Sequence, residues 1–319
     1  MAPKSPLIVA VALNPAFDRI LHVPGLQLGA HVRGRLVSIQ PAGKAVNVAR
    51  LLGLMGSPCI LTGFVGEGDR GRFEKSFAKT PVRVEMFEGH GLTRENITLV
   101  DPKQGVETHI RDVGFALTED DLKRIGRKLS ILAQKGAHVV LAGSLPPGVD
   151  AAAFARLLAT CQEKGAYVAV DSSGPGLEAV RKVRNLWLIK PNREELSEIS
   201  GKPVETEKDI RAAVEPLLKR IEQVVVTMGA EGAYLFCREG AWRARPHVEN
   251  QDIAKTVGAG DALMAGFVRC HAAKKPPPEC LRWGVASGTA SCFQLRAGVV
   301  NPYDVKACYE KVELNAVKG

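Results

Sequence analysis

Residues 256–267 read Thr256-Val257-Gly258-Ala259-Gly260-Asp261-Ala262-Leu263-Met264-Ala265-Gly266-Phe267. Two glycines and an alanine open an apolar helix here, so backbone N–H groups at the helix start can approach a bound anion closely. The helix dipole adds roughly half a positive charge at the same place. We therefore predict an anion site made by Gly258, Ala259 and Gly260, with the carboxylate of Asp261 beside it. Taken alone, Asp261 could also be a residue that only matches the helix dipole.

A P-loop does not explain this anion site. The nearest match to that motif lies at residues 38–45, where Gly43-Lys44 lacks the glycine five residues earlier and is followed by alanine rather than serine or threonine. The chain therefore does not look like a P-loop kinase. Gly43, Lys44 and Asn47 need a different role.

Composition and charge narrow the class of ligand. The length of 319 residues favours one large domain, 1–319, and 45% hydrophobic with 24% charged residues is ordinary for a soluble globular protein. The net charge of +9 is dispersed along the chain, and aromatic residues make up only 5%. The dispersed charge forms no basic stripe, and the scarcity of aromatic residues argues against nucleic-acid recognition by stacking. We expect a phosphorylated small molecule as the partner, and no nucleic acid or membrane.

The cysteines and the N-terminus indicate the compartment. Seven cysteines form no C-x-x-C pair, and their number is odd. Neither a disulfide framework nor a zinc site is indicated, which favours reduced thiols in a cytoplasmic protein. The apolar run at 7–13 is too short for a signal peptide and is followed at once by Asn14 and Pro15, so we interpret it as a buried first strand.

Strand-like and helix-like segments alternate through most of the chain. Short apolar runs rich in β-branched residues, typical of strands, occur at 139–141, 167–170, 186–189 and 224–226, and helical patterns occur between them at 119–134, 150–164, 192–199 and 207–221. Strands that are apolar on both faces indicate a mainly parallel sheet covered by helices. The fold class is therefore α/β.

Two segments interrupt this alternation. Residues 18–39 and 95–113 contain strand-like pieces at 19–23, 32–39, 97–100 and 106–111, which alternate apolar and polar residues between turn signals. This pattern is typical of a half-exposed antiparallel sheet. We expect the two segments to form a small β lid on the main domain.

Seven stretches, in the same order along the chain, resemble the ribokinase-like sugar kinases of the PfkB family. They are Leu13-Asn14-Pro15-Ala16-Phe17-Asp18, Ala42-Gly43-Lys44-Ala45-Val46-Asn47-Val48-Ala49, Gly63-Phe64-Val65-Gly66, Gly143-Ser144-Leu145-Pro146-Pro147-Gly148, Lys190-Pro191-Asn192-Arg193-Glu194-Glu195, Val226-Thr227-Met228-Gly229-Ala230-Glu231-Gly232 and Thr256 to Asp261. The resemblance implies a Rossmann-type core with a β lid over the sugar. It also implies an ATP-dependent and Mg²⁺-dependent sugar kinase.

Within the family, the first and fourth stretches are similar to the hexose-phosphate branch, whose members phosphorylate ketohexose monophosphates. The favoured reaction is the conversion of fructose 1-phosphate to fructose 1,6-bisphosphate. Tagatose-6-phosphate kinase and 6-phosphofructokinase activities stay open, since the acceptors differ by one stereocentre or by the carbon that carries the phosphate. The chain departs from the family at Pro41-Ala42, where several consecutive glycines are usual.

The resemblance also implies the residues that carry the chemistry. Asp261 matches the catalytic base, and Gly258, Ala259 and Gly260 supply the backbone donors beside it. Lys190, Asn192 and Glu195 match the phosphate and magnesium region, where Asn192 and Glu195 would hold Mg²⁺ through water. The alternative for this pair is an ordinary N-cap with a glutamate in the first turn of a helix.

The remaining candidates fall into two groups. The sugar-phosphate candidates are Asn14, Asp18, Gly43, Lys44, Asn47, Arg94, Asn96 and Ser144, with Arg111 a weaker one because lone lid arginines are usually solvated. The nucleotide candidates are Lys190, Asn192, Thr227, Gly229, Gly232 and Ser287. Gly232 could instead form only a hairpin turn before residues 233–237.

Two further hypotheses concern a rival function and the oligomeric state. A non-catalytic sugar-phosphate or nucleotide sensor on the same fold is the rival function, although it need not keep the base, the Mg²⁺ pair and the anion site together. The exposed lid strands are edge strands that need cover. We therefore expect a homodimer formed through the lid.

Overall fold

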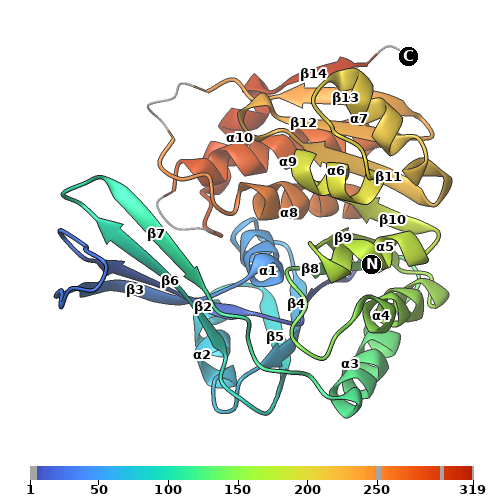
Figure 1. The fold of residues 1–319 in the computed structure, drawn as a ribbon. Coiled ribbons are helices and arrows are strands. Elements are labelled where there is room, and N and C mark those ends of the chain that lie inside the picture. Colours follow the sequence, from blue (N-terminus) through green and yellow to red (C-terminus); the bar gives the residue numbers. More distant parts are fainter. Residues whose placement is uncertain (1–5, 249–252, 295–297, 318–319) are drawn as a thin grey trace.

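The computed structural model describes residues 6–248, 253–294 and 298–317 (Figure 1). Within them, ten strands form the main sheet in the order β14-β13-β12-β11-β10-β9-β8-β1-β4-β5. The strands are β1 Ile8–Ala12, β4 Cys59–Val65, β5 Val82–Glu88, β8 His138–Ala142, β9 Tyr167–Asp171, β10 Leu186–Ile189, β11 Ile221–Thr227, β12 Ala233–Cys237, β13 Gly240–Arg245 and β14 Glu313–Ala316. The pairs from β5 to β11 are parallel, and those from β11 to β14 are antiparallel.

Helices cover both faces of this sheet. One face carries α1 Lys44–Leu54, α2 Arg70–Phe77, α8 Ala259–Ala272, α9 Pro277–Cys292 and α10 Pro302–Lys311. The other carries α3 Glu119–Leu132, α4 Ala151–Glu163, α5 Pro175–Lys182, α6 Arg193–Ser200 and α7 Glu207–Val214. The α/β class and the mainly parallel sheet are thus confirmed.

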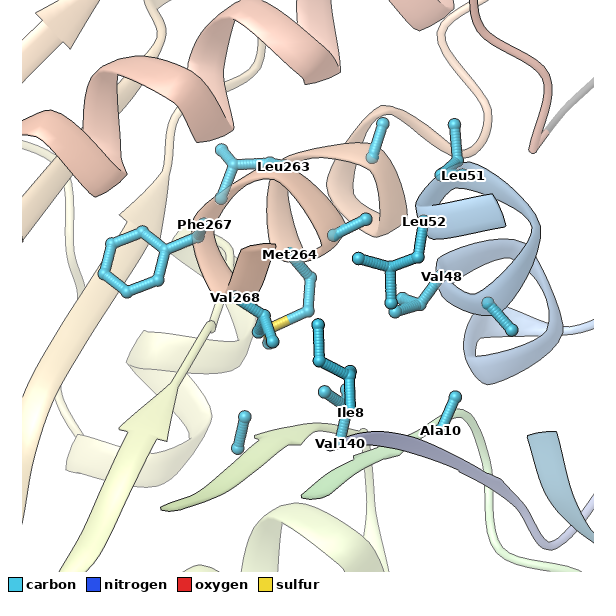
Figure 2. Packing of buried hydrophobic residues seen from close by; sticks show 14 of the residues in the cluster. Ile8, Ala10, Val48, Leu51, Leu52, Val140, Leu263, Met264, Phe267 and Val268 are labelled. Carbon is cyan, nitrogen blue, oxygen red and sulfur yellow. The ribbon is translucent and has the colours of Figure 1, made fainter. Parts of the chain in front are cut away.

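Strand β1 shows why both faces are apolar. Ile8, Ala10 and Ala12 join the core on the α8 side, and the alternate residues Val9 and Val11 join the opposite core. Figure 2 shows the first of these cores, where Met264 and Val268 of α8 face Val48 and Leu52 of α1 above β1 and β8. None of the helices in the described ranges is both long and apolar enough to cross a membrane.

Most predicted elements of the main sheet and its helices lie within one or two residues of the observed ones. The lid strands predicted at 19–23, 32–39 and 97–100 instead begin three residues away, at Ala16, Arg35 and Arg94. The helix predicted at 207–221 is wrong at its end. Helix α7 ends at Val214, a short 3-10 turn follows at Leu217–Lys219, and β11 already begins at Ile221. Pro216 explains the difference, since proline has no N–H to donate to the preceding turn and its ring crowds the carbonyl there, which stops the helical hydrogen-bond series.

The lid is a separate four-stranded sheet, visible as the blue and green arm in Figure 1. Its order is β3-β2-β6-β7, with β2 Ala16–His22, β3 Arg35–Ala42, β6 Arg94–Asp101 and β7 Val106–Arg111. The outer pairs are antiparallel as expected, whereas the central pair β2 and β6 is parallel. The reason lies in the main sheet: β1 and β5 run in the same direction there, and each leads at its carboxyl end toward one of these two lid strands.

The two faces of the lid sheet differ in the polarity of their side chains. Register pairs place Asp18 beside Asn96 and Asn96 beside Arg111, so these polar residues share one face. The other face carries apolar side chains, namely Leu21, Leu36, Ile39, Ile97, Leu99 and Ile110. The polar face lines a small cavity together with Lys255 and Val257, which immediately precede α8.

Candidate active site

The site lies where the strand order of the main sheet reverses. After β1 the chain builds β4 and β5 on one side, and later β8 to β11 on the other, which leaves a crevice at the carboxyl ends of β1 and β8. Asn14 follows β1 and Ser144 follows β8, and the Asn14 side-chain amide donates to Ser144 Oγ at 3.3 Å. These two predicted residues therefore meet across the crevice.

The glycine-rich start of α8 faces the same crevice. Gly258 adopts a left-handed conformation with φ 93°, and the N–H of Ala259 donates to Thr256 O at 3.2 Å. The N–H groups of Gly260 and Asp261 lie in the first turn, where a helix offers them no acceptor. A Cβ atom at position 260 would lie 3.1 Å from Lys190 Nζ, so glycine leaves room for the ammonium group beside the helix start. The predicted anion site thus consists of free N–H groups next to a lysine.

Asp261 is buried and hydrogen-bonded. Its Oδ2 accepts from the side-chain amide of Asn47 at 2.8 Å. Burial, followed by the nearby negative charge of Asp171, raises the pKa of Asp261 to about 7, against the opposing effects of Asn47, Lys44 and Lys190. A carboxyl group whose pKa lies near neutral pH is well suited to accept a proton during catalysis.

Asp171 is a residue that the sequence analysis missed. It ends β9, is fully buried, and accepts from Lys44 Nζ at 2.8 Å through Oδ1, while its Oδ2 lies 3.0 Å from Lys190 Nζ. Burial acts to raise the pKa of Asp171, but the two lysines outweigh it and lower the value. The same pairing raises the pKa of Lys44 in spite of its burial. One carboxylate therefore holds two ammonium groups beside the start of α8.

Asn192 and Glu195 form a capping box at the start of α6. The side chain of Asn192 accepts from the N–H of Glu195 at 2.7 Å, and Glu195 Oε2 accepts from the N–H of Asn192 at 2.9 Å. The alternative of an ordinary N-cap is thus confirmed as a structural role. The other oxygen, Glu195 Oε1, lies 3.8 Å from Lys44 Nζ and faces the crevice residues.

The structure separates the nucleotide candidates. Thr227 bridges to Asn192 at the end of β11, next to the capping box, and Gly229 is exposed in the short turn Gly229–Glu231. Gly232 closes the turn between β11 and β12, since the N–H of Met228 donates to its carbonyl at 2.8 Å. Gly232 therefore forms a hairpin turn, and its contact with the nucleotide stays a prediction.

Ser287 does not join the others. Its side chain is 1% exposed, and its hydroxyl donates to Trp283 O within α9 at 2.8 Å. A Cβ at Gly266 would lie 2.4 Å from Ser287 Oγ, so this serine fills the contact between α8 and α9. Ser287 therefore has a packing role between α8 and α9, and its contact with a nucleotide stays a prediction.

The sugar-side candidates meet at the base of the lid. The side chain of Asn96 donates to Asp18 Oδ1 at 2.8 Å, and Gly43 caps α1 with φ 114°. Arg94 donates to the carbonyls of Asn14 and Asp112 at 2.9 and 3.0 Å. It thereby ties the end of β1 to the segment after β7.

An open cleft of about 950 Å³ lies beside these residues and is lined by Asn14, Arg94, Arg111 and Ser144. Burial and the neighbouring charge of Arg111 lower the pKa of Arg94. Two guanidinium groups that repel each other at the wall of a cleft would both be stabilised by a bound anion. The weaker candidate Arg111 thus lies with the stronger ones.

The donors around Lys44 suit a magnesium ion that arrives with a nucleotide. Asp171, Asn192 and Glu195 offer oxygen atoms, and Mg²⁺ usually binds through one or two carboxylates, water and substrate phosphates. Among the described residues no group of three acidic, histidine or cysteine side chains forms a ready metal site.

The sequence of the whole chain is similar to those of known carbohydrate kinases. The model of the pfkB family carbohydrate kinases matches residues 7–303. A 1-phosphofructokinase from Vibrio cholerae is 33% identical over 312 residues, which cover 97% of each chain.

Solved structures give the same picture of the fold. Phosphofructokinase-2 from Escherichia coli, in complex with potassium, superimposes with a TM-score of 0.90 at 26% identity and covers 96% of this chain and 99% of its own. Other structures of that protein are described as a complex with fructose-6-phosphate and as a tetrameric inhibited form. Arabidopsis thaliana ribokinase, at 21% identity, shares the fold with a TM-score of 0.75, covering 97% of this chain and 99% of its own.

Proposed function

Because this chain belongs to the pfkB family of carbohydrate kinases and is an ATP-dependent sugar kinase, we propose that it transfers the γ-phosphoryl group of ATP to fructose 1-phosphate. The product would be fructose 1,6-bisphosphate. The observation that carries the chemistry is the buried carboxylate of Asp261 beside the free N–H groups of α8 and the paired lysines Lys44 and Lys190.

The proposed reaction uses these groups in distinct roles. The C6 hydroxyl oxygen of the sugar forms a bond to the γ-phosphorus, the bond from that phosphorus to the β–γ bridging oxygen breaks, and ADP leaves. Asp261 takes the hydroxyl proton. The first-turn N–H groups and the two lysines stabilise the charge on the moving phosphoryl group, which is where most of the rate enhancement in phosphoryl transfer arises.

Mg²⁺ is part of the proposal as the partner of ATP. Glu195, Asn192 and Asp171 would hold it, in part through water, and the ion would neutralise charge on the β- and γ-phosphates. Thr227 and Gly229 would lie along the same nucleotide, next to Asn192.

Substrate recognition falls to the lid and the crevice. Asn14, Asp18, Gly43 and Asn96 would bind sugar hydroxyls. Arg94, Arg111 and Ser144 would hold the phosphate, because they line one cleft at the base of the lid. Fructose 6-phosphate, present in a structure of the Escherichia coli relative, and tagatose 6-phosphate are the alternative acceptors.

The apolar face of the lid supports a homodimer. Ile110 and Leu36 are each 50% exposed on that face, and the strands that carry them are the edges of the lid sheet. Apolar edge strands need cover, and a second lid would supply it. The seven free cysteines suit a reducing compartment, and we place the protein in the cytoplasm.

A coupled assay of ADP release tests the proposal directly. The acceptors are fructose 1-phosphate, fructose 6-phosphate, tagatose 6-phosphate, ribose and fructose, each with ATP and with or without Mg²⁺. We expect the highest kcat/KM with fructose 1-phosphate. A higher value with another acceptor would replace the substrate, and binding without turnover across the panel would favour the sensor.

A further inference from the structure

Arg50 is a buried arginine that none of the roles above uses. It lies on α1, one turn after Asn47, and its side chain is 8% exposed. Nη1 donates to Asn47 Oδ1 at 3.1 Å, and Nη2 donates to the carbonyl of Pro41, next to the end of lid strand β3. Its guanidinium also lies 5.4 Å from the ring centre of Phe77. Both hydrogen-bond acceptors of this buried cation are uncharged oxygens.

The contact with Arg50 decides which way the Asn47 amide points. Arginine can only donate, so the atom of Asn47 that faces it must be the carbonyl oxygen Oδ1. The amide nitrogen Nδ2 then faces Asp261 and donates to its Oδ2 at 2.8 Å. With the opposite orientation, two oxygens would meet at Asp261 unless its carboxyl were protonated. Arg50 therefore favours the ionised form of Asp261 without touching it.

A glycine in a distant part of the sequence closes over this pair. Gly298 has φ +71°, and a Cβ atom there would lie 2.5 Å from Asn47 Oδ1 and 2.9 Å from Arg50 Nη1. Position 298 therefore accepts only glycine while the Arg50 to Asn47 contact stays as it is. The backbone of Gly298 itself therefore lies close to this hydrogen bond.

We propose that Arg50 is a positioning residue for phosphoryl transfer: it fixes the Asn47 amide so that Asn47 donates to Asp261. Through Pro41 the same side chain links the base of the lid to the catalytic carboxylate. The inference rests on the proposed function, because it takes Asp261 as the base.

The charged groups around Asp261 act on its pKa and therefore on the pH dependence of kcat. Asp171 faces it from β9, Lys44 from α1, and Lys190 from the end of β10. Asn47 supplies the hydrogen bond that lowers its pKa. Loss of this donor should therefore raise the pKa of Asp261 and leave less of the ionised base at neutral pH.

The test compares Arg50→Met, Asn47→Ala and the double variant with wild type, using kcat and KM across pH with the best acceptor of the panel. We expect Arg50→Met to lower kcat at neutral pH about tenfold and to move the acid limb about one pH unit upward, with little change in either KM. In the Asn47→Ala background, Arg50→Met should have almost no further effect on kcat, since the two residues act as one unit.

Arg269→Met is the matched control. Arg269 lies near the far end of α8, is partly buried, and donates to Ser57 Oγ at 3.1 Å. Its loss should leave the pH profile unchanged. If Arg50→Met proves too unstable to assay, Arg50→Gln replaces it, because the glutamine amide both donates and accepts and so no longer determines which atom of Asn47 faces it.

The outcomes separate this inference from the proposed function. Additive effects of the two substitutions, or an unshifted acid limb in Arg50→Met, would overturn the role of Arg50 while the kinase assignment stood. An inactive wild type across the whole acceptor panel would overturn both.

Discussion

Lys44 Nζ lies 2.8 Å from Asp171 Oδ1 at the centre of the crevice. The lysine opens α1, directly after the lid strand β3, whereas the aspartate ends β9 of the main sheet. The second oxygen of the same carboxylate lies 3.0 Å from Lys190. Asp171 thus holds two cations in place for a phosphorylated ligand, and its charge also acts on Asp261.

Replacing Asp171 by asparagine should change both the rate and its pH dependence. The lysines lose their anchor, and we expect kcat/KM to fall about 10²-fold, as for other groups that organise charge stabilisation. The charge of Asp171 raises the pKa of Asp261, so its removal should move the acid limb of kcat/KM to lower pH. The pH at the midpoint of the acid limb does not depend on what fraction of the protein is active. Partial unfolding of the variant would therefore not obscure the shift. Asp120→Asn, at an exposed pair with Lys123, is the control and should behave like wild type.

Asp261→Asn should lower kcat and raise the free energy of unfolding at neutral pH. Loss of the base should lower kcat by about 10² to 10⁴. The native pKa of this carboxyl is raised from 3.8 to about 7, so the folded protein binds the proton more tightly than the unfolded chain. The wild type therefore loses stability as pH rises through this interval, by an amount on the order of 4 kcal/mol that asparagine avoids.

Thermal unfolding of both proteins from pH 4 to pH 8 measures that effect. The advantage of Asp261→Asn should be smallest at pH 4, grow toward pH 7 and then level off. A difference in Tm that stays constant across this range would contradict the raised pKa.

Arg111→Met should weaken recognition of the phosphate. Arg111 is exposed at the lid and lies near Arg94 at the wall of one cleft, so its loss should not disturb folding. We expect the KM for the sugar phosphate to rise about tenfold, in line with the loss of a charge-assisted hydrogen bond. The KM for unphosphorylated fructose should not change. An equal effect on both acceptors, or an equal effect from Arg127→Met on α3, would argue against a phosphate contact.

The elements that were predicted well are those whose local pattern determines their environment. A strand buried on both faces must be a continuous apolar run, as in residues 186–189, and its sequence alone reveals it. Strand β14 shows the opposite case. Glu313–Ala316 is mostly exposed and has no apolar run, and it becomes a strand only because β13 lies beside it. That pairing is a tertiary contact, which a local pattern does not contain.

The same contrast between local patterns and tertiary contacts applies to the residues of the candidate site. The glycines before Asp261 form a recognisable motif because backbone approach to an anion restricts several neighbouring positions. Asp171 was missed because one aspartate after a strand resembles many others, and its role depends on two lysines distant in sequence. Ser287 shows a related ambiguity, because small residues on a helix suit close helix packing as well as a ligand. Its hydroxyl lies against Gly266 of α8, and its role toward the nucleotide stays a prediction.

Ile110→Asp should dissociate the proposed homodimer. Ile110 is 50% exposed on the edge strand β7. Across the lid sheet it shares one face with Ile97, Arg19 and Ile39, which lie beside one another in register. A carboxylate at this position would be desolvated in the contact between two lids, where the cation on the same face, Arg19, is already paired with Glu95 at 2.8 Å. Its desolvation should weaken the dimer about 10²-fold or more. Sedimentation velocity over a range of protein concentrations measures the change.

The control for this prediction is Ile131→Asp, an equivalent change at a residue that is 67% exposed on α3. It should leave the sedimentation coefficient unchanged, since α3 lies on the far side of the main sheet from α1 and α8 and is not part of the lid. The polar lid face that carries Asp18 and Asn96 is untouched by either substitution. Ile110→Asp should therefore affect activity only as far as the partner lid is needed to keep the lid strands in place, which comparing kcat at high and low protein concentration measures. A wild type that sediments as a monomer at every concentration would refute the dimer and leave the apolar lid face without its proposed cover.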